Sequence, residues 1–130
     1  PAAFADTPCR DAILRSRHVH VDAGGLLCPG TCAGLVLGRA SDAGSVGRLW
    51  AGLDEAFSGE GTGTEGPFEL VALLAEAGPV ALMRRARGEG YPPRTEGYAG
   101  KCHLCWHVRR WLFDRGLAGD RLGPAEVYRP

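Results

Sequence analysis

The chain contains one short segment in which polar and hydrophobic residues alternate, His18-Val-His-Val-Asp22. Alternation with a period of two is typical of a β-strand that has one buried face. Gly24 and Gly25 follow, and glycine readily adopts the positive φ angles that a tight turn requires. The apolar residues 26–28 then predict the return strand of a β-hairpin, and residues 34–38 predict a third short strand or an extended connection.

Beyond residue 45 the hydrophobic positions recur with the period of a helix. The apolar positions on the shared face are Val46, Leu49, Trp50, Leu53, Ala56 and Phe57. Two further apolar helices are predicted over 68–77 and from Pro79 to about Arg87, because Gly78 can end the first and Pro79 can begin the second. The last and strongest pattern predicts a helix over 102–115, with Gly116 as its stop.

Segments rich in glycine and proline separate these elements. Residues 58–66 and 88–100 are predicted to be loops, and the second of them leads directly to Cys102. A short helix is predicted over 11–17, and the tail after Gly116 is predicted to be extended and to lie on the surface. We therefore predict a single α+β domain over residues 1–130, with a short β-hairpin packed against several helices.

Composition narrows the class of protein. The 130 residues include 15 basic and 15 acidic side chains, so the net charge of zero does not favour a nucleic-acid partner. No apolar run reaches the ~20 residues that span a bilayer, and no charged-then-apolar leader opens the sequence, so we predict no membrane partner and a cytoplasmic location. The first residue is Pro rather than Met, and we expect the chain to be a fragment of something longer.

The five cysteines are the residues with the clearest chemical meaning. Cys102 and Cys105 lie at a loop-to-helix junction, where positions i and i+3 share a face and the free backbone N–H groups favour thiolates. This Cys-x-x-Cys pair predicts half of a metal site. Cys28 and Cys32 flank a sharp Pro-Gly-Thr bend after the hairpin, and Cys9 approaches from the N-terminal segment.

Thiolates that converge from distant parts of a chain suit two kinds of centre, tetrahedral zinc and an iron-sulfur cluster. The spacing alone does not separate the two. Disulfides match less well, because the number of cysteines is odd and no secretory leader is evident. We therefore expect the hairpin and the helices to surround a cysteine-ligated metal site.

The run HVHVDAGGLLCPG resembles a known kind of domain, together with Cys9 upstream, a Gly-to-Leu-Trp helix over 44–50 and the distant Cys-x-x-Cys. It is similar to the C-terminal auxiliary-cluster domains of radical S-adenosylmethionine enzymes, called SPASM and, in shortened form, twitch domains. The resemblance implies one auxiliary [4Fe-4S] cluster, with these ligands: Cys9, Cys28, Cys102 and Cys105. Cys32 has no place in that pattern, so it is spare, or it replaces Cys28, or it acts on substrate.

The same resemblance implies a role in electron transfer and in closing the substrate site. The implied partner is a radical S-adenosylmethionine catalytic domain in the same chain or in a partner chain. The Cys-x-x-x-Cys-x-x-Cys motif of the catalytic cluster is absent from this sequence. The chain is therefore not expected to perform radical chemistry alone.

The alternative hypothesis is a structural zinc module that serves protein interactions, with Cys28, Cys32, Cys102 and Cys105 in a closed site. Cys9 separates the two hypotheses, because only the cluster requires it. A small enzyme with Cys32 as its nucleophile ranks last, since no paired base is evident in the sequence.

Four polar side chains near the Cys-x-x-Cys pair carry weaker expectations. His103 and His107 are four positions apart on the predicted helix, and we expect them to lie outside the ligand set. Arg109 and Arg110 are expected on a solvated helix face. The alternatives for both arginines are neutralisation of a cluster's charge and contact with a catalytic domain.

Overall fold

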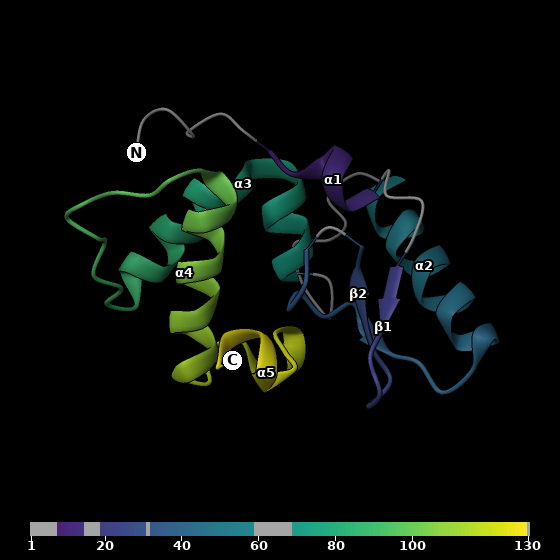
Figure 1. Ribbon diagram of the computed structural model, residues 1–130. Coiled ribbons are helices and arrows are strands. Elements are labelled where there is room, and N and C mark those ends of the chain that lie inside the picture. The colour runs from purple at the N-terminus through teal and green to yellow at the C-terminus, as the bar shows by residue number, and fades with distance from the viewer. Residues whose placement is uncertain (1–7, 15–18, 31, 59–68, 130) are drawn as a thin grey trace.

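The structure, a computed structural model, describes residues 8–14, 19–30, 32–58 and 69–129, and at positions 14, 43, 53–58 and 120 it describes the backbone alone. Helices and a three-stranded antiparallel sheet form within these residues, which confirms the predicted α+β class. In chain order the elements are α1 (Arg10–Leu14), β1 (Val19–Val21), β2 (Leu26–Pro29), β3 (Gly38–Arg39), α2 (Ala43–Ser58), α3 (Glu69–Gly88), α4 (Lys101–Asp114), the 3-10 helix η3 (Gly119–Arg121) and α5 (Ala125–Tyr128). Figure 1 shows α4 at one side of the molecule and the sheet with α2 at the other.

The predicted hairpin is confirmed. Strand β1 pairs with β2 in an antiparallel register that places Val19 opposite Pro29 and Val21 opposite Leu27. The turn is closed by the carboxylate of Asp22, which accepts hydrogen bonds from the amides of Gly24 (2.8 Å) and Leu26 (2.9 Å). The third strand lies at residues 38–39, where the predicted segment 34–38 ends, and it pairs with β2.

The helices begin and end close to where their sequence signals lie. At the start of α2 the side chains of Asp42 and Ser45 cap each other's backbone amides, at 2.7 and 3.0 Å. Gly78 interrupts α3 with φ 81° and ψ −178°, which confirms the predicted break, although the predicted start at residue 68 lies outside the described residues. Gly116, with φ 66°, ends α4 as predicted. None of the described helices is both long and apolar enough to cross a membrane.

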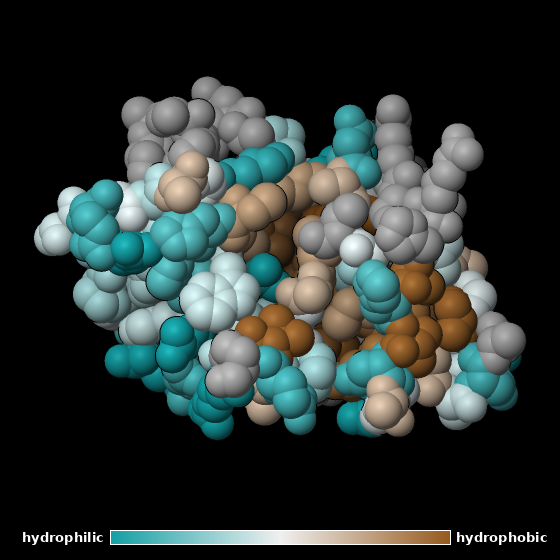
Figure 2. Space-filling view, viewed as in Figure 1, coloured by the Kyte–Doolittle hydropathy of each residue, from teal (hydrophilic) through white to brown (hydrophobic). Residues whose placement is uncertain are grey.

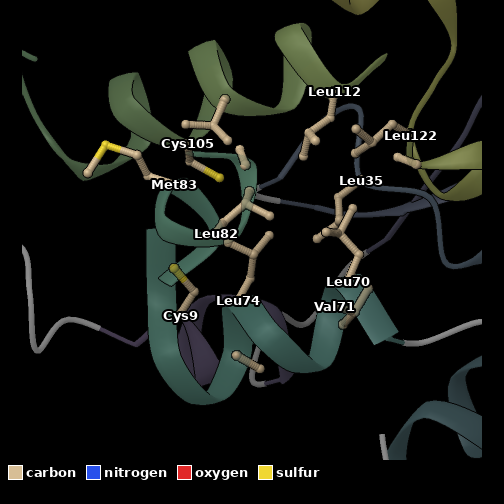
Figure 3. Packing of buried hydrophobic residues seen from close by; sticks show 14 of the residues in the cluster. Cys9, Leu35, Leu70, Val71, Leu74, Leu82, Met83, Cys105, Leu112 and Leu122 are labelled. Atoms are coloured by element: carbon tan, nitrogen blue, oxygen red, sulfur yellow. The ribbon is translucent and has the colours of Figure 1, made fainter. Parts of the chain in front are cut away.

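The core is built mainly from α3 and α4, which face each other, with α1 packed on α3. Figure 3 shows the closely packed side chains of this cluster, and Cys9 and Cys105 lie within it. The amide of Cys9 donates a 2.9 Å hydrogen bond to the carbonyl oxygen of Leu74, which fastens the N-terminal segment to α3. Fully buried members of the core include Ile13, Leu27, Leu35, Leu74, Leu82, Leu104 and Val108.

The C-terminal tail differs from the prediction of an extended surface segment. It forms η3 and α5, and Figure 1 shows α5 beside the lower end of α4. Leu122 and Tyr128 are buried, at 4% and 0% exposure. The backbone is tied to the segment after β2, because the amide of Val36 donates to the carbonyl oxygen of Arg121 (2.8 Å) and that of Gly123 to Gly34 (3.1 Å). The tail therefore completes the core, since burial of these two side chains stabilises it.

Candidate metal centre

Four of the five cysteines line one cavity of about 340 Å³: Cys9, Cys32, Cys102 and Cys105. They come from three separate parts of the chain, which are the residue before α1, the turn after β2 and the first turns of α4. Apart from the thiols and Arg109, the wall is apolar, with side chains such as Ile13, Leu35, Leu74 and Trp106. Figure 2 shows the surface hollowed between α4 and the sheet, with hydrophobic residues around the opening.

Local hydrogen bonds hold the first two of these cysteines in place. The carbonyl oxygen of Cys9 accepts from the amide of Ile13 at 3.0 Å, so Cys9 stands at the start of α1. Cys32 follows a turn in which its amide donates to the carbonyl oxygen of Pro29, and its own carbonyl accepts from the amide of Leu35, both at 3.2 Å. Both backbones are thus anchored to neighbouring elements.

The Cys-x-x-Cys pair lies where the sequence predicted, in the first turns of α4. The extended backbone of Gly100 begins the helix, and its carbonyl oxygen accepts from the amide of Leu104 at 3.0 Å. Cys102 is exposed, whereas Cys105 is only 8% exposed. One helix face therefore presents an outer and an inner thiol to the same cavity.

Cys28, which the family resemblance placed among the ligands, does not line this cavity. It lies within β2 opposite His20 and is 6% exposed. Strand β2 contributes no lining residue, and the chain reaches the cavity only after the turn at residues 29–32. The structure thus brings together three predicted ligands, Cys9, Cys102 and Cys105, and adds Cys32 in the place of Cys28.

Burial raises the pKa of three of the cysteine thiols, Cys9, Cys28 and Cys105. It raises the pKa of Cys9 to about 11, with the charge of Lys101 opposing the rise. Burial also raises the pKa of Cys105, and Arg109 is the main group that opposes this. Burial raises the pKa of Cys28 as well, and a hydrogen bond from the backbone N–H of Gly34 opposes this rise. A metal centre at the cavity would therefore release protons as it forms.

Arg109 is buried beside the thiols, at 7% exposure, which corrects the expectation of a solvated face. Its Nη1 donates to the carbonyl oxygen of Ala33 at 2.8 Å and to the hydroxyl of Tyr128 at 3.0 Å. Its Nε is buried and forms no hydrogen bond with any residue that the structure describes. Among the side chains that the structure describes, no carboxylate forms an ion pair with Arg109. Arg110, in contrast, is exposed as expected.

Tyr128 contacts the site through Arg109, and sequence reasoning missed this residue because the tail was expected on the surface. Its hydroxyl accepts from Arg109 and donates to the carbonyl oxygen of Gly34 at 2.7 Å. The guanidinium of Arg109 also lies 5.8 Å from the centre of the Tyr128 ring. Tyr128 therefore links α4 to the turn that carries Cys32.

The two histidines of α4 lie outside the cavity lining and bond to each other. Their Nε2 atoms are 3.0 Å apart, and Nη1 of Arg94 lies 3.1 Å from each. The backbone amide of Ala99 donates to Nδ1 of His103 at 3.0 Å, which ties this ring to the loop before α4. This arrangement fixes the loop before α4 and leaves the thiols as the donors of the cavity.

The donor set of the cavity consists of thiols, which suit either zinc or an iron-sulfur cluster. Among the described residues, no group of three or more His, Cys, Asp or Glu side chains is arranged so that it could hold a metal ion directly. A zinc ion needs its sulfur ligands at ~2.3 Å from one point, whereas a cluster takes its thiolates around a body of several atoms. The apolar wall and the buried guanidinium suit an anionic centre of that kind.

Comparison with known proteins assigns no family to this geometry. No family model, no curated protein and no solved structure matches the chain.

Proposed function

We propose that this chain binds a [4Fe-4S] cluster and serves as the auxiliary-cluster domain of a radical S-adenosylmethionine enzyme. The proposed ligands are Cys9, Cys32, Cys102 and Cys105. The observation that carries the proposal is that these four thiols, from three distant parts of the sequence, line one cavity. The set differs from the one implied by the family resemblance at a single position, with Cys32 replacing Cys28.

A cluster with four thiolate ligands would supply one-electron transfer, and it would leave no open position for substrate. The residues of the chain support that role. Apolar side chains around the thiols limit access of water, which affects the potential of such a centre. Cys102 is exposed, so the centre would lie close to the molecular surface and to a docked catalytic domain.

The proposed partner is therefore the radical S-adenosylmethionine catalytic domain, whose substrate site this domain would help to close. A cytoplasmic location is proposed with it, since the five described cysteines form no disulfide, and thiols persist in reducing compartments. A structural zinc module built from the pairs 28/32 and 102/105 is less well supported, because Cys28 lies outside the cavity.

The test uses Cys28 and Cys32 as a matched pair, since they are four residues apart and only Cys32 lines the cavity. The chain is purified without oxygen, and iron, sulfide and zinc per chain are measured with the visible absorption spectrum. We expect about four irons and four sulfides, lost in Cys32→Ala and in Cys9→Ala but retained in Cys28→Ala. One zinc per colourless chain, indifferent to Cys9→Ala, would replace the proposal by the zinc module.

A further inference from the structure

We infer that Arg109 is the positioning residue of the metal centre, which holds the Cys32 turn against α4 and places a buried positive charge beside the four thiolates. The inference rests on the proposed function, because it concerns the same cavity. It goes further in assigning a role to a side chain that is not a ligand.

The first support is the burial of a charge without a counter-charge. A buried guanidinium is costly unless an anion compensates it. Arg109 is 7% exposed, and no described carboxylate pairs with it. The anions available to it are the thiolates of the cavity that it lines. When the cavity holds a metal centre, its thiolates therefore compensate the positive charge of Arg109. Arg109 in turn stabilises the negative charge of the thiolates.

The second support is the pattern of hydrogen bonds. Nη1 donates to the carbonyl oxygen of Ala33, the residue after Cys32, and to the hydroxyl of Tyr128, which donates to the carbonyl oxygen of Gly34. One guanidinium thus fixes two successive carbonyl groups behind Cys32. Arg109 also lies four residues after Cys105, on the same helix face. The distance between the Cys32 turn and the inner thiol of α4 is therefore set through Arg109.

The buried Nε of Arg109 is the third support. It has no hydrogen-bond partner among the described residues, and such a donor costs free energy when it is left unmet. Its partner in the loaded site is expected to be a thiolate sulfur, which accepts a hydrogen bond more strongly than a protonated thiol does. A lysine in the same place would carry the charge without the planar array of donors that serves both the turn and the cavity.

The charge role predicts a shift in reduction potential. Reduction adds an electron to an already anionic centre, and a nearby positive charge stabilises the reduced state. We expect Arg109→Gln to lower the midpoint potential in a dye-mediated anaerobic titration, and Arg109→Lys to lower it less. Arg110→Gln is the matched control, because it removes the same charge from the exposed neighbour on α4 and should leave the potential close to that of the unchanged chain.

The positioning role predicts an effect in the metal-free chain, which does not depend on loading. Both Arg109→Lys and Arg109→Gln should increase the alkylation rate of Cys32 several-fold, because the turn loses its hold on α4, whereas Arg110→Gln should not change it. Circular dichroism verifies that each variant is folded. A variant that fails to fold is replaced by Tyr128→Phe, which weakens the same link and should also expose Cys32.

The outcomes separate the two proposals. A loaded Arg109→Gln chain with an unchanged potential, or a shift equalled by Arg110→Gln, overturns the charge role while the proposed function stands. An unchanged alkylation rate at Cys32 overturns the positioning role. If the unchanged chain takes up no iron, the proposed function fails, and the charge role fails with it, whereas the alkylation result still decides whether Arg109 positions the turn.

Discussion

The hydroxyl of Tyr128 donates a 2.7 Å hydrogen bond to the carbonyl oxygen of Gly34, a residue 94 positions earlier in the chain. Gly34 has a φ of 90°, in the region that favours glycine, and a Cβ built on it would lie 2.5 Å from the Tyr128 hydroxyl oxygen and 2.8 Å from Cγ1 of Val127. The turn behind Cys32 and helix α5 therefore meet so closely that only glycine fits between them.

The first prediction concerns this close approach. Gly34→Ala should lower the free energy of unfolding by about 2 kcal/mol or more, because it adds a steric clash to the cost of a positive φ. Urea denaturation followed by circular dichroism measures the change. Gly90→Ala is the control, since Gly90 has a φ of 104° but nothing within 4 Å of an added Cβ. If the free energy of unfolding falls equally in the two variants, the close contact with Tyr128 does not contribute to the effect of Gly34→Ala.

The second prediction concerns the hydroxyl itself. Tyr128→Phe leaves the ring in place and removes one partner from Arg109 and one from Gly34. A buried polar group that loses its partner costs about 1–3 kcal/mol, so the free energy of unfolding should fall by an amount in that range. Val127→Ala, in the same helix, gives the comparison for lost apolar contact alone. A Tyr128→Phe chain as stable as the unchanged one would mean that water replaces the hydroxyl at both partners.

The third prediction is a loss of stability at alkaline pH. Burial raises the pKa of Tyr128 to about 12, although Arg109 opposes the rise. An unfolded tyrosine titrates near ~10, so between these values the folded state holds more protons than the unfolded state. The free energy of unfolding should therefore fall as pH increases above about 10, and this contribution is fully present only below that pH.

Tyr128→Phe removes this contribution, so its stability should decrease less steeply between about pH 10 and pH 12. Denaturation curves at several pH values measure the slope. Burial also raises the pKa of Tyr91, so part of the alkaline loss remains in Tyr128→Phe, and Tyr91→Phe should reduce the slope independently. Parallel pH curves for Tyr128→Phe and the unchanged chain would contradict the buried position of the hydroxyl.

The elements that the sequence predicted well are those with a local physical cause. The hairpin follows from alternation and a glycine turn, the break at Gly78 from the residue's own flexibility, and the shared face of Cys102 and Cys105 from their spacing. These features depend on a few neighbouring residues. A single sequence contains that information.

The features that were missed depend on contacts between distant segments. Nothing in the bend between Cys28 and Cys32 shows which of the two faces the cavity, because the direction is set by how the turn packs on α4. Arg109 was expected in solvent because arginines mostly are. The sequence did contain one signal for its position. Arg109 lies four residues after Cys105, so the two side chains share a helix face and both can reach the same site.

The fourth prediction concerns the alkylation rate of each cysteine, which reports how accessible its thiol is. In the metal-free chain, Cys102 should be alkylated fastest, because it is the exposed cysteine, and Cys32, which is partly buried, should follow. The three buried thiols should react slowly. For Cys9, a pKa of about 11 in place of 9.0 lowers the thiolate fraction at mildly alkaline pH by about a hundredfold. Mass spectrometry of peptides after timed alkylation gives each rate.

Loading the centre should change this order in a way that identifies the ligands. A thiolate bound to iron is shielded from the reagent, so Cys102 and Cys32 should lose most of their reactivity in the anaerobically loaded chain. Cys28 lies outside the cavity, and its slow rate should stay the same. Protection of Cys102 with continued reaction at Cys32 would exclude Cys32 as a ligand and return Cys28 to the set. Protection of both Cys102 and Cys32 would instead place the turn after β2 at the centre, because no other part of β2 or its turn contributes a thiol to the cavity.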